Sequence, residues 1–250
     1  MRVAVAGGTG VVGKHVVASL EEGGHDVVVL ARSTGVDVIT TDGLDESMQG
    51  VDAVVDVTNV QTLNRTKATE FFTTATLHLL AAEARAGVGH HVVLSIVGVD
   101  RVPSGYYQAK AAQEDAVVAG DVPFTVLRAT QFHEFAGQVL DRVPGPIALL
   151  PRMRMQPVAA SEVGAELARL ATSAPEGSRL DMAGPEEHDL PDLARRVLAS
   201  EGRRRWVVGV RLPGPAGRGM AHGGLLPTGP ATLGTVRFAD WLADRTASTT

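Results

Sequence analysis

A glycine-rich turn near the start of the chain limits the possible folds more than any other segment. It reads Gly7-Gly8-Thr9-Gly10-Val11-Val12-Gly13 and follows the apolar run 2–6. Glycine adopts positive φ without steric cost, so such a turn brings bare backbone against an anion, which the N-terminus of the next helix also attracts. The spacing alone is equally compatible with a plain turn between strand and helix. A helical pattern and a second apolar run, 25–30, follow, and together they predict a dinucleotide-binding β-α-β unit.

The tip of the second predicted strand indicates which dinucleotide is bound. An acidic residue at this place binds a free ribose 2′-hydroxyl, whereas an arginine accommodates a 2′-phosphate. Arg32 occupies the position, with Ser33 beside it, and the first carboxylate is Asp37. We therefore predict NADP(H) in preference to NAD(H), although an exposed arginine in a polar loop would leave that preference open.

Two further apolar segments, 36–40 and 51–57, are expected to be strands of the same sheet. Ligands of open α/β sheets bind at the carboxyl ends of the strands, so Asp42, Thr58 and Asn59 are expected to flank the adenosine half of the cofactor. Each of them is also an ordinary turn residue.

Residues that can carry chemistry follow the next predicted strand, which ends at Ser95. A helix is predicted from Ser104, its N-cap, to 119, and Tyr106 and Lys110 share one face of it at spacing i, i+4. A neighbouring ammonium stabilises a phenolate and is expected to lower the pKa of Tyr106. Tyr106 would then act as a general acid, with Ser95 orienting the substrate oxygen. The alternative is a tyrosine packed on the core and a solvated lysine.

These residues together resemble the short-chain dehydrogenase/reductase superfamily, and more closely its atypical, NmrA-like NAD(P)H-binding branch. The resemblance extends to about residue 132 and includes 123–130, which is similar to the segment that passes the nicotinamide in that branch. It implies a catalytic set of Ser95, Tyr106 and Lys110. It also implies cofactor contacts, and with the residues above the expected set is Gly7, Thr9, Gly10, Val11, Val12, Gly13, Arg32, Ser33, Asp42, Thr58, Asn59 and Lys110.

Two departures from the family pattern affect the catalytic set. The interval from Ser95 to Tyr106 is slightly shorter than usual, and Tyr107 is adjacent, so either tyrosine can be the acid. The resemblance implies an NADPH-dependent oxidoreductase that transfers hydride to a carbonyl or quinone-like small molecule. A non-catalytic NADP(H) redox sensor and a cofactor-dependent isomerase or epimerase are the alternatives. The Tyr106 and Lys110 pair favours the reductase, because a sensor does not need it.

The predicted fold is an α/β protein with a Rossmann-type doubly wound parallel sheet and a small C-terminal region that covers the substrate. Residues 1–130 would form the core, and 131–250 a smaller cap of the same structural domain. Gln131, Phe132 and His133 are expected to line the substrate pocket. The glycine- and proline-rich segment 212–234 is either a lid or a plain connection.

Composition narrows the partners. The net charge of −5 argues against nucleic acid, and without cysteine there is no thiolate ligand or nucleophile. Neighbouring His90 and His91 point to opposite faces of a strand, so no metal site is predicted. No apolar run approaches 18 residues, and we expect a cytoplasmic protein with a small-molecule substrate and no membrane partner. The choice between monomer and homodimer stays open.

Overall fold

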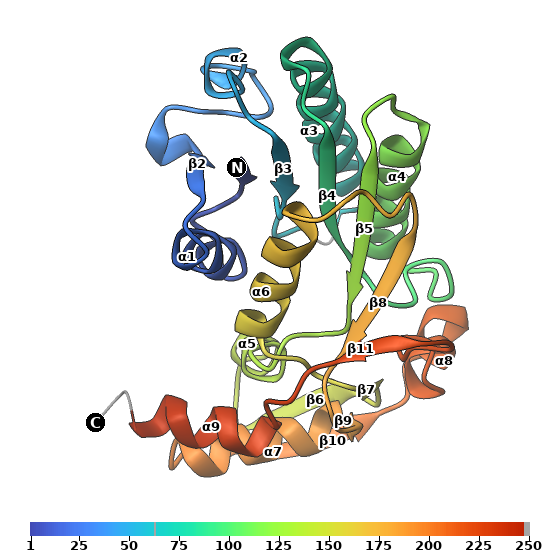
Figure 1. The fold of residues 1–250 in the computed structure, drawn as a ribbon. Helices are drawn as coiled ribbons and strands as arrows, with labels where there is room; N and C mark the ends of the chain where they lie inside the picture. The colour runs from blue at the N-terminus through green and yellow to red at the C-terminus, as the bar shows by residue number, and fades with distance from the viewer. Residues whose placement is uncertain (63, 248–250) are drawn as a thin grey trace. The chain divides into compact units, whose positions relative to one another are not determined.

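The computed structural model describes residues 1–62 and 64–247, which form two units interleaved along the chain (Figure 1). The first unit contains residues 1–95, 104–128 and 160–180, and the second contains 96–103, 129–159 and the chain from 181 onwards. The division predicted near residue 130 stays a prediction.

A parallel sheet carries the predicted cofactor turn. Its strand order is β2-β1-β3-β4-β5-β8-β11, which confirms the Rossmann-type α/β fold. Strand β1 pairs in parallel with both β2 and β3, and β3 pairs with β4. Strands β1 and β3 are buried, nearly continuous apolar runs, as expected for a sheet that is covered on both faces. The strands are β1 Arg2–Ala6, β2 Asp26–Leu30, β3 Ala53–Asp56, β4 His90–Ile96, β5 Phe124–Ala129, β8 Arg179–Ala183 and β11 Ala231–Leu233.

Two helices of the first unit begin at residues whose side chains cap them. The side chain of Asn64 accepts from the Lys67 amide at the start of α3. Ser104 caps α4 in the same way, as expected from the sequence. The helices are α1 Gly13–Glu22, the 3₁₀ turn η1 Arg32–Thr34, α2 Leu44–Ser47, α3 Arg65–Ala86, α4 Gly105–Ala119 and α6 Ala160–Ala171.

The prediction of a strand over 36–40 is wrong, because this segment forms turns. The carboxylate of Asp37 accepts hydrogen bonds from the amides of Ile39 and Thr40, at 2.7 and 3.4 Å. Thr41 then takes a positive φ of 67°. An aspartate that bonds its own backbone two residues on favours a turn over a sheet ladder, and here that local preference prevails.

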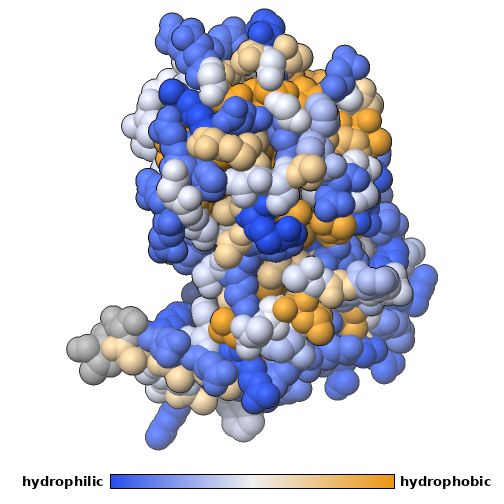
Figure 2. Space-filling view, in the orientation of Figure 1, coloured by the Kyte–Doolittle hydropathy of each residue, from blue (hydrophilic) through white to orange (hydrophobic). Residues whose placement is uncertain are grey.

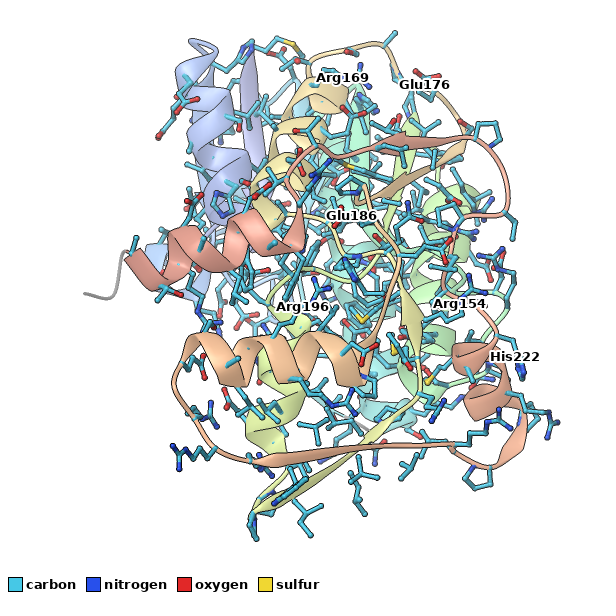
Figure 3. All side chains as sticks on the ribbon, turned by 90° about the horizontal axis from the view of Figure 1, so that it is seen from below. Arg154, Arg169, Glu176, Glu186, Arg196 and His222 are labelled. Atoms are coloured by element: carbon cyan, nitrogen blue, oxygen red, sulfur yellow. The ribbon has the colours of Figure 1, made fainter. Side chains whose placement is uncertain are left out.

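The second unit contains two small sheets and four helices among its described residues. Strand β6 (Ile147–Pro151) pairs in parallel with β10 (Trp206–Val210), and β7 (Arg154–Met155) pairs antiparallel with β9 (His188–Asp189). Arg154 opens β7 (Figure 3). The segment 212–234 contains one helix and β11, and its role as a lid stays a prediction. The helices are α5 Phe135–Arg142, α7 Leu190–Ser200, α8 Gly214–Ala221 and α9 Phe238–Ala247.

Hydrophilic residues cover most of the surface seen in Figure 2, with apolar residues in separate patches between them. Within residues 1–62 and 64–247, no helix has both the length and the apolar character needed to cross a bilayer.

The turn after β1 leaves no room for a side chain on Gly13. A Cβ there would lie 2.2 Å from the carbonyl oxygen of Gly7 and 2.7 Å from the Cα of Gly8. Both are backbone atoms, which cannot rotate away. This contact sets α1 directly against the end of the strand.

We therefore expect Gly13→Ala to lower the free energy of unfolding by about 1–3 kcal/mol, since either the turn or the helix must shift. Urea unfolding of the cofactor-free protein measures the change. Ala18→Ser, at an exposed position of the same helix, is the control and should change stability by about 0.5 kcal/mol or less. Equal stability of the Gly13→Ala variant and the wild type would contradict the close approach.

Candidate functional site

The glycine turn offers unpaired backbone amides to an anion. Gly7 has a φ of +80°, and a Cβ on it would lie 3.0 Å from the carbonyl oxygen of Val57. Among the described residues, the amides of Val11 and Val12 donate to no backbone acceptor. Helix α1 starts directly after them, without a side-chain cap and without an acidic residue in its first turn. Its dipole is therefore available to a bound pyrophosphate, and the turn fits a dinucleotide.

Arg32 and Ser33 are available at the tip of β2. Both are exposed in η1, and neither side chain makes a hydrogen bond or ion pair within the described part of the chain. Thr34, in contrast, is occupied, because its hydroxyl donates to the Val29 carbonyl at 2.8 Å and accepts from the Ala31 amide at 3.1 Å. The tip of β2 thus holds a free guanidinium and a free hydroxyl.

The three residues predicted to flank the adenosine half differ in their surroundings. Thr58 lies against the glycine turn, since its Cα is 3.2 Å from a Cβ placed on Gly7. The Thr58 hydroxyl is buried and has no hydrogen-bond partner in the described structure. Asp42 is exposed and accepts from Thr40 at 2.6 Å. The side-chain oxygen of Asn59 accepts a hydrogen bond from Tyr106 of α4.

The Tyr106 side chain is fixed at both its hydroxyl and its ring. The hydroxyl donates to Asn59 Oδ1 at 2.7 Å. The Tyr106 ring packs edge-on against Phe72, with 5.7 Å between the ring centroids. Burial raises the pKa of Tyr106 to about 12. The expected lowering of this pKa by Lys110 is therefore wrong, because the ammonium has other partners.

Lys110 is buried and holds several elements together. Its Nζ donates to the carbonyl oxygen of Leu94 on β4 at 2.6 Å and to Gln113 Oε1. Gln113 Nε2 donates in turn to Asp56 at the end of β3, at 2.8 Å, and to Thr76 on α3, at 3.1 Å. Sequence reasoning missed this network, although Gln113 stands one helical turn after Lys110. Burial lowers the pKa of Lys110 to about 8, against the opposing charge of Asp56.

Ser95 lies on β4 with its hydroxyl committed to a carboxylate. It donates to Glu114 Oε1 at 2.5 Å, and Glu114 also binds Arg128 at 2.7 Å and Arg179 at 2.8 Å. Burial alone would raise the pKa of Glu114, but the hydrogen bonds from Arg128, Ser95 and Arg179 hold it below its usual range. The role of Ser95 in orienting a substrate oxygen stays a prediction, and it requires the hydroxyl to leave Glu114.

The predicted substrate residues follow β5 and belong to the second unit. Both amide atoms of Gln131 are buried without a hydrogen-bond partner among the described residues. Phe132 forms an isolated bridge with Val158. His133 is in contact with the Val236 carbonyl at 3.1 Å, and its ring centroid lies 5.6 Å from that of Phe238. Their role toward a substrate stays a prediction.

The two neighbouring histidines lie apart, as their alternation on a strand predicts. His91 is paired with the buried Glu83 at 2.8 Å, and His90 contacts Thr125 at 2.8 Å. Over residues 1–62 and 64–247, no group of three or more His, Asp or Glu side chains could hold a metal ion.

A parallel α/β sheet with free amides at its first turn and a free arginine after its second strand defines a dinucleotide-binding protein. The chain belongs to the NAD(P)H-binding family, whose model matches residues 7–144. This result supports the resemblance to the short-chain dehydrogenase/reductase superfamily that the sequence motifs indicate.

Known relatives and structures extend the comparison. Photosystem II assembly factor Ycf39 of Synechocystis is 25% identical over 147 residues, or 53% of this chain, and the chain spans 45% of that relative's length. The NADPH complex of the quinone oxidoreductase QOR2 from Escherichia coli is similar with a TM-score of 0.71 and 17% identity, over 97% of this chain and 99% of that one. The NAD complex of UDP-glucose 4-epimerase from Thermus thermophilus is similar with a TM-score of 0.72 and 20% identity, over 100% of both chains. Such low identities show a shared fold.

The pKa of Lys110 makes a prediction about stability. With a pKa near 8 in the folded state and 10.5 as the ordinary value, the unfolded chain binds more protons between pH 8 and 10. Stability from this group therefore rises with pH through that window, by up to about 2 kcal/mol, whereas below pH 8 the cost of burying the charge is present in full. In Lys110→Met the rise should disappear. Urea unfolding without cofactor at several pH values measures it.

Lys67→Met, at an exposed position of α3, is the matched control and should keep the wild-type pH dependence. If the stability of the Lys110→Met variant rose with pH as much as that of the wild type, the pH dependence would belong to another titrating group.

Proposed function

We propose that the protein is an NADPH-dependent reductase that transfers hydride to a carbonyl or quinone-like small molecule. The carrying observation is the position and protonation of Tyr106. Its hydroxyl lies 2.7 Å from Asn59, which follows β3, the strand next to the one that leads into the glycine turn. A phenol with a pKa near 12 keeps its proton at neutral pH, so it can donate to an alkoxide but not act as a base.

The proposed reaction balances with one proton from the chain. NADPH held by the glycine turn and Arg32 would supply the hydride for the carbonyl carbon and would be left as NADP⁺. Tyr106 gives its proton to the oxygen, so the carbonyl becomes an alcohol, and the phenolate takes a proton from solvent. Asn59 holds the Tyr106 hydroxyl beforehand by accepting its hydrogen bond, and Lys110, one helical turn further along α4, holds that helix to the Leu94 carbonyl of β4.

Two observations support NADPH over NADH and a quinone-like acceptor. The free guanidinium of Arg32 beside the Ser33 hydroxyl suits a 2′-phosphate. Among proteins of similar fold, QOR2 is an NADPH-dependent quinone oxidoreductase, although other neighbours were solved with NAD.

A redox sensor that binds NADP(H) without turnover is the second candidate. It is favoured by the engagement of Ser95 with Glu114 and of Lys110 with the Leu94 carbonyl, since these contacts occupy two of the three groups that catalysis would use. Titration with NADPH, followed by its absorbance in the presence of quinones, ketones and aldehydes, separates the two. Oxidation by an acceptor supports the reductase, and tight binding without oxidation supports the sensor.

Arg32→Ala should weaken NADPH binding by about 10- to 100-fold, because a charge-assisted bond to phosphate is lost, and leave NADH binding nearly unchanged. Fluorescence or calorimetric titration with both cofactors measures the effect. Lys67→Ala removes a cation elsewhere in the first unit and should change neither affinity. Equal losses for NADPH and NADH in Arg32→Ala would refute the 2′-phosphate assignment.

Tyr106→Phe should lower turnover with any acceptor found by about 100- to 10,000-fold, since the general acid is lost. NADPH affinity should stay within about twofold, because the ring and its contact with Phe72 are kept. Tyr107→Phe is the matched control and should retain activity. The reverse result would move the acid to Tyr107, and full activity of both variants would exclude a tyrosine acid.

A further inference from the structure

The sheet formed by β6 and β10 in the second unit has one uncovered apolar face. Trp206 lies opposite Ile147 in the strand register, and Val208 lies opposite Leu149. Trp206 is 76% exposed, Ile147 52%, Val208 45% and Leu149 56%. The alternating residues Ala148, Leu150 and Val207 are buried, on the face where α7 packs against both strands. The sheet is therefore apolar on its covered and on its open face, and exposed apolar patches of this kind mark interaction sites.

The segments that flank the same two strands carry a concentrated positive charge. Segments 142–152 and 203–213 contain six arginines and no aspartate or glutamate, in a chain whose net charge is −5. We call the four exposed apolar side chains and these arginines the arginine sheet. Its arginines are Arg142, Arg152, Arg203, Arg204, Arg205 and Arg211.

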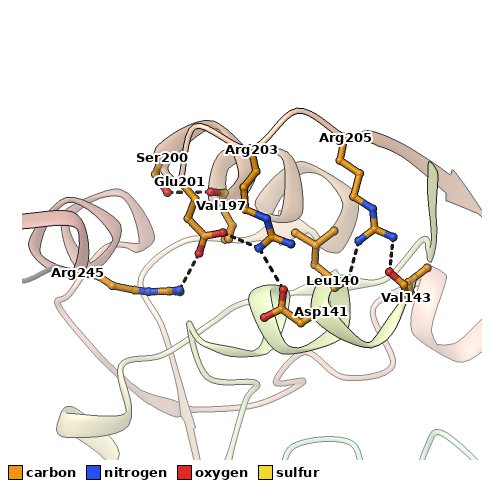
Figure 4. Close-up of polar contacts among 9 residues, drawn as sticks. All are labelled: Leu140, Asp141, Val143, Val197, Ser200, Glu201, Arg203, Arg205 and Arg245. Atoms are coloured by element: carbon orange, nitrogen blue, oxygen red, sulfur yellow. Dashed lines mark hydrogen bonds and ion pairs between the residues drawn. The ribbon is translucent and has the colours of Figure 1, made fainter. Parts of the chain in front are cut away.

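Little of this charge is neutralised within the chain. Arg203 alone is paired with carboxylates, Asp141 at 3.1 Å and Glu201 at 2.7 Å, among the contacts that the described structure contains (Figure 4). Arg205 donates to the carbonyl oxygens of Leu140 and Val143 at the C-terminal end of α5, and it has no carboxylate partner among the described residues. Arg204 and Arg211 are exposed and have no ion pair in the described part of the molecule.

We propose that the arginine sheet docks on the surface of an anionic lipid bilayer. A tryptophan with aliphatic neighbours partitions into the interfacial region of a bilayer, where its ring has both apolar and polar surroundings. Arginines around it reach anionic headgroups while their alkyl stems stay on the apolar surface. This departs from the expectation of no membrane partner, which rested on the lack of a spanning segment. It does not depend on the proposed reductase activity.

The charge pattern argues against two other occupants. A second copy docked by a two-fold axis would bring the same arginines of each copy together, with repulsion among those that have no carboxylate partner in the described structure. Single-stranded nucleic acid needs aromatic rings on which bases stack, and here one tryptophan stands among aliphatic side chains. An acidic protein surface is the competing partner, and the vesicle experiment distinguishes it from a lipid bilayer.

Co-sedimentation of the full chain with vesicles tests the proposal. The probes are phosphatidylcholine vesicles with and without about 30 mol% phosphatidylglycerol, at about 0.1 and 0.5 M salt. We expect binding to the anionic vesicles only, weakened several-fold at the higher salt because headgroup attraction is screened.

Variants locate the contact on the arginine sheet. Arg204→Ser with Arg211→Ser should weaken the partition by roughly 30-fold, from about fivefold for each charge near the surface. Trp206→Ser should weaken it by about tenfold or more. The matched controls are Leu77→Ser, whose side chain is 56% exposed on α3, and Lys67→Ser with Arg218→Ser, which removes two exposed cations. Both controls should bind as the wild type does.

Unchanged thermal midpoints and NADPH titrations of the variants would establish that they are folded. Equal binding by the wild type and the arginine-sheet variants would overturn the proposal, as would equal losses in the controls. Absence of binding to anionic vesicles would also overturn it and leave an acidic protein as the partner that the charge suits. A concentration-dependent dimer in sedimentation, abolished by Trp206→Ser in the absence of vesicle binding, would assign the face to a second copy.

Discussion

The ammonium of Lys110 is a buried cation, and the arrangement of the site depends on how it is satisfied. Its bonds reach the Leu94 carbonyl on β4 and, through Gln113, the carboxylate of Asp56 at the end of β3. Removing one member would leave a charge or a polar group unpaired in the interior, which costs more than an apolar replacement of the whole set would. Lys110 therefore fixes α4 relative to both strands, and burial makes this cation lose its proton more easily than a solvated lysine.

The position of the proposed acid follows from the same network. Besides Gln113, Asp56 accepts from the amide of Thr58, at 2.8 Å, and so holds the start of the loop in which Asn59 binds the Tyr106 hydroxyl. Burial disfavours the charged form of both Tyr106 and Lys110, so it raises the pKa of the phenol to about 12 and lowers that of the ammonium to about 8. Protonated phenol is the form that the proposed reduction requires, and burial keeps Tyr106 in that form at neutral pH. The Tyr106 environment thus suits reduction of a carbonyl better than oxidation of an alcohol.

Local patterns in the sequence predicted what local forces decide, and little beyond that. The glycine turn, the buried strands and the Ser104 cap were predictable because each depends on residues adjacent in the chain. The strand over 36–40 was not, since the Asp37 side chain competes for the same backbone. The partners of Ser95 and Lys110 were also missed, because a strand-end or i, i+4 pattern does not say which buried carboxylate or carbonyl will lie nearest. Tyr106 shows the consequence, as its pKa shift comes from burial against Phe72, a residue of another helix.

Net charge illustrates the same limit at the scale of a surface. A total of −5 argues against binding to polyanions only if the charges are spread evenly, and here two segments that are distant in the sequence carry six arginines without an acid. Each segment alone is unremarkable, because 142–152 holds two of these arginines and the run at 203–205 is short. Parallel pairing of β6 with β10 brings them side by side, and the register places Trp206 and Ile147 on the same open face. Interactions of exposed charges weaken beyond about 8–10 Å at physiological salt, so a partner responds to this local density and not to the total. The composition of the whole chain therefore does not decide what its second unit can bind.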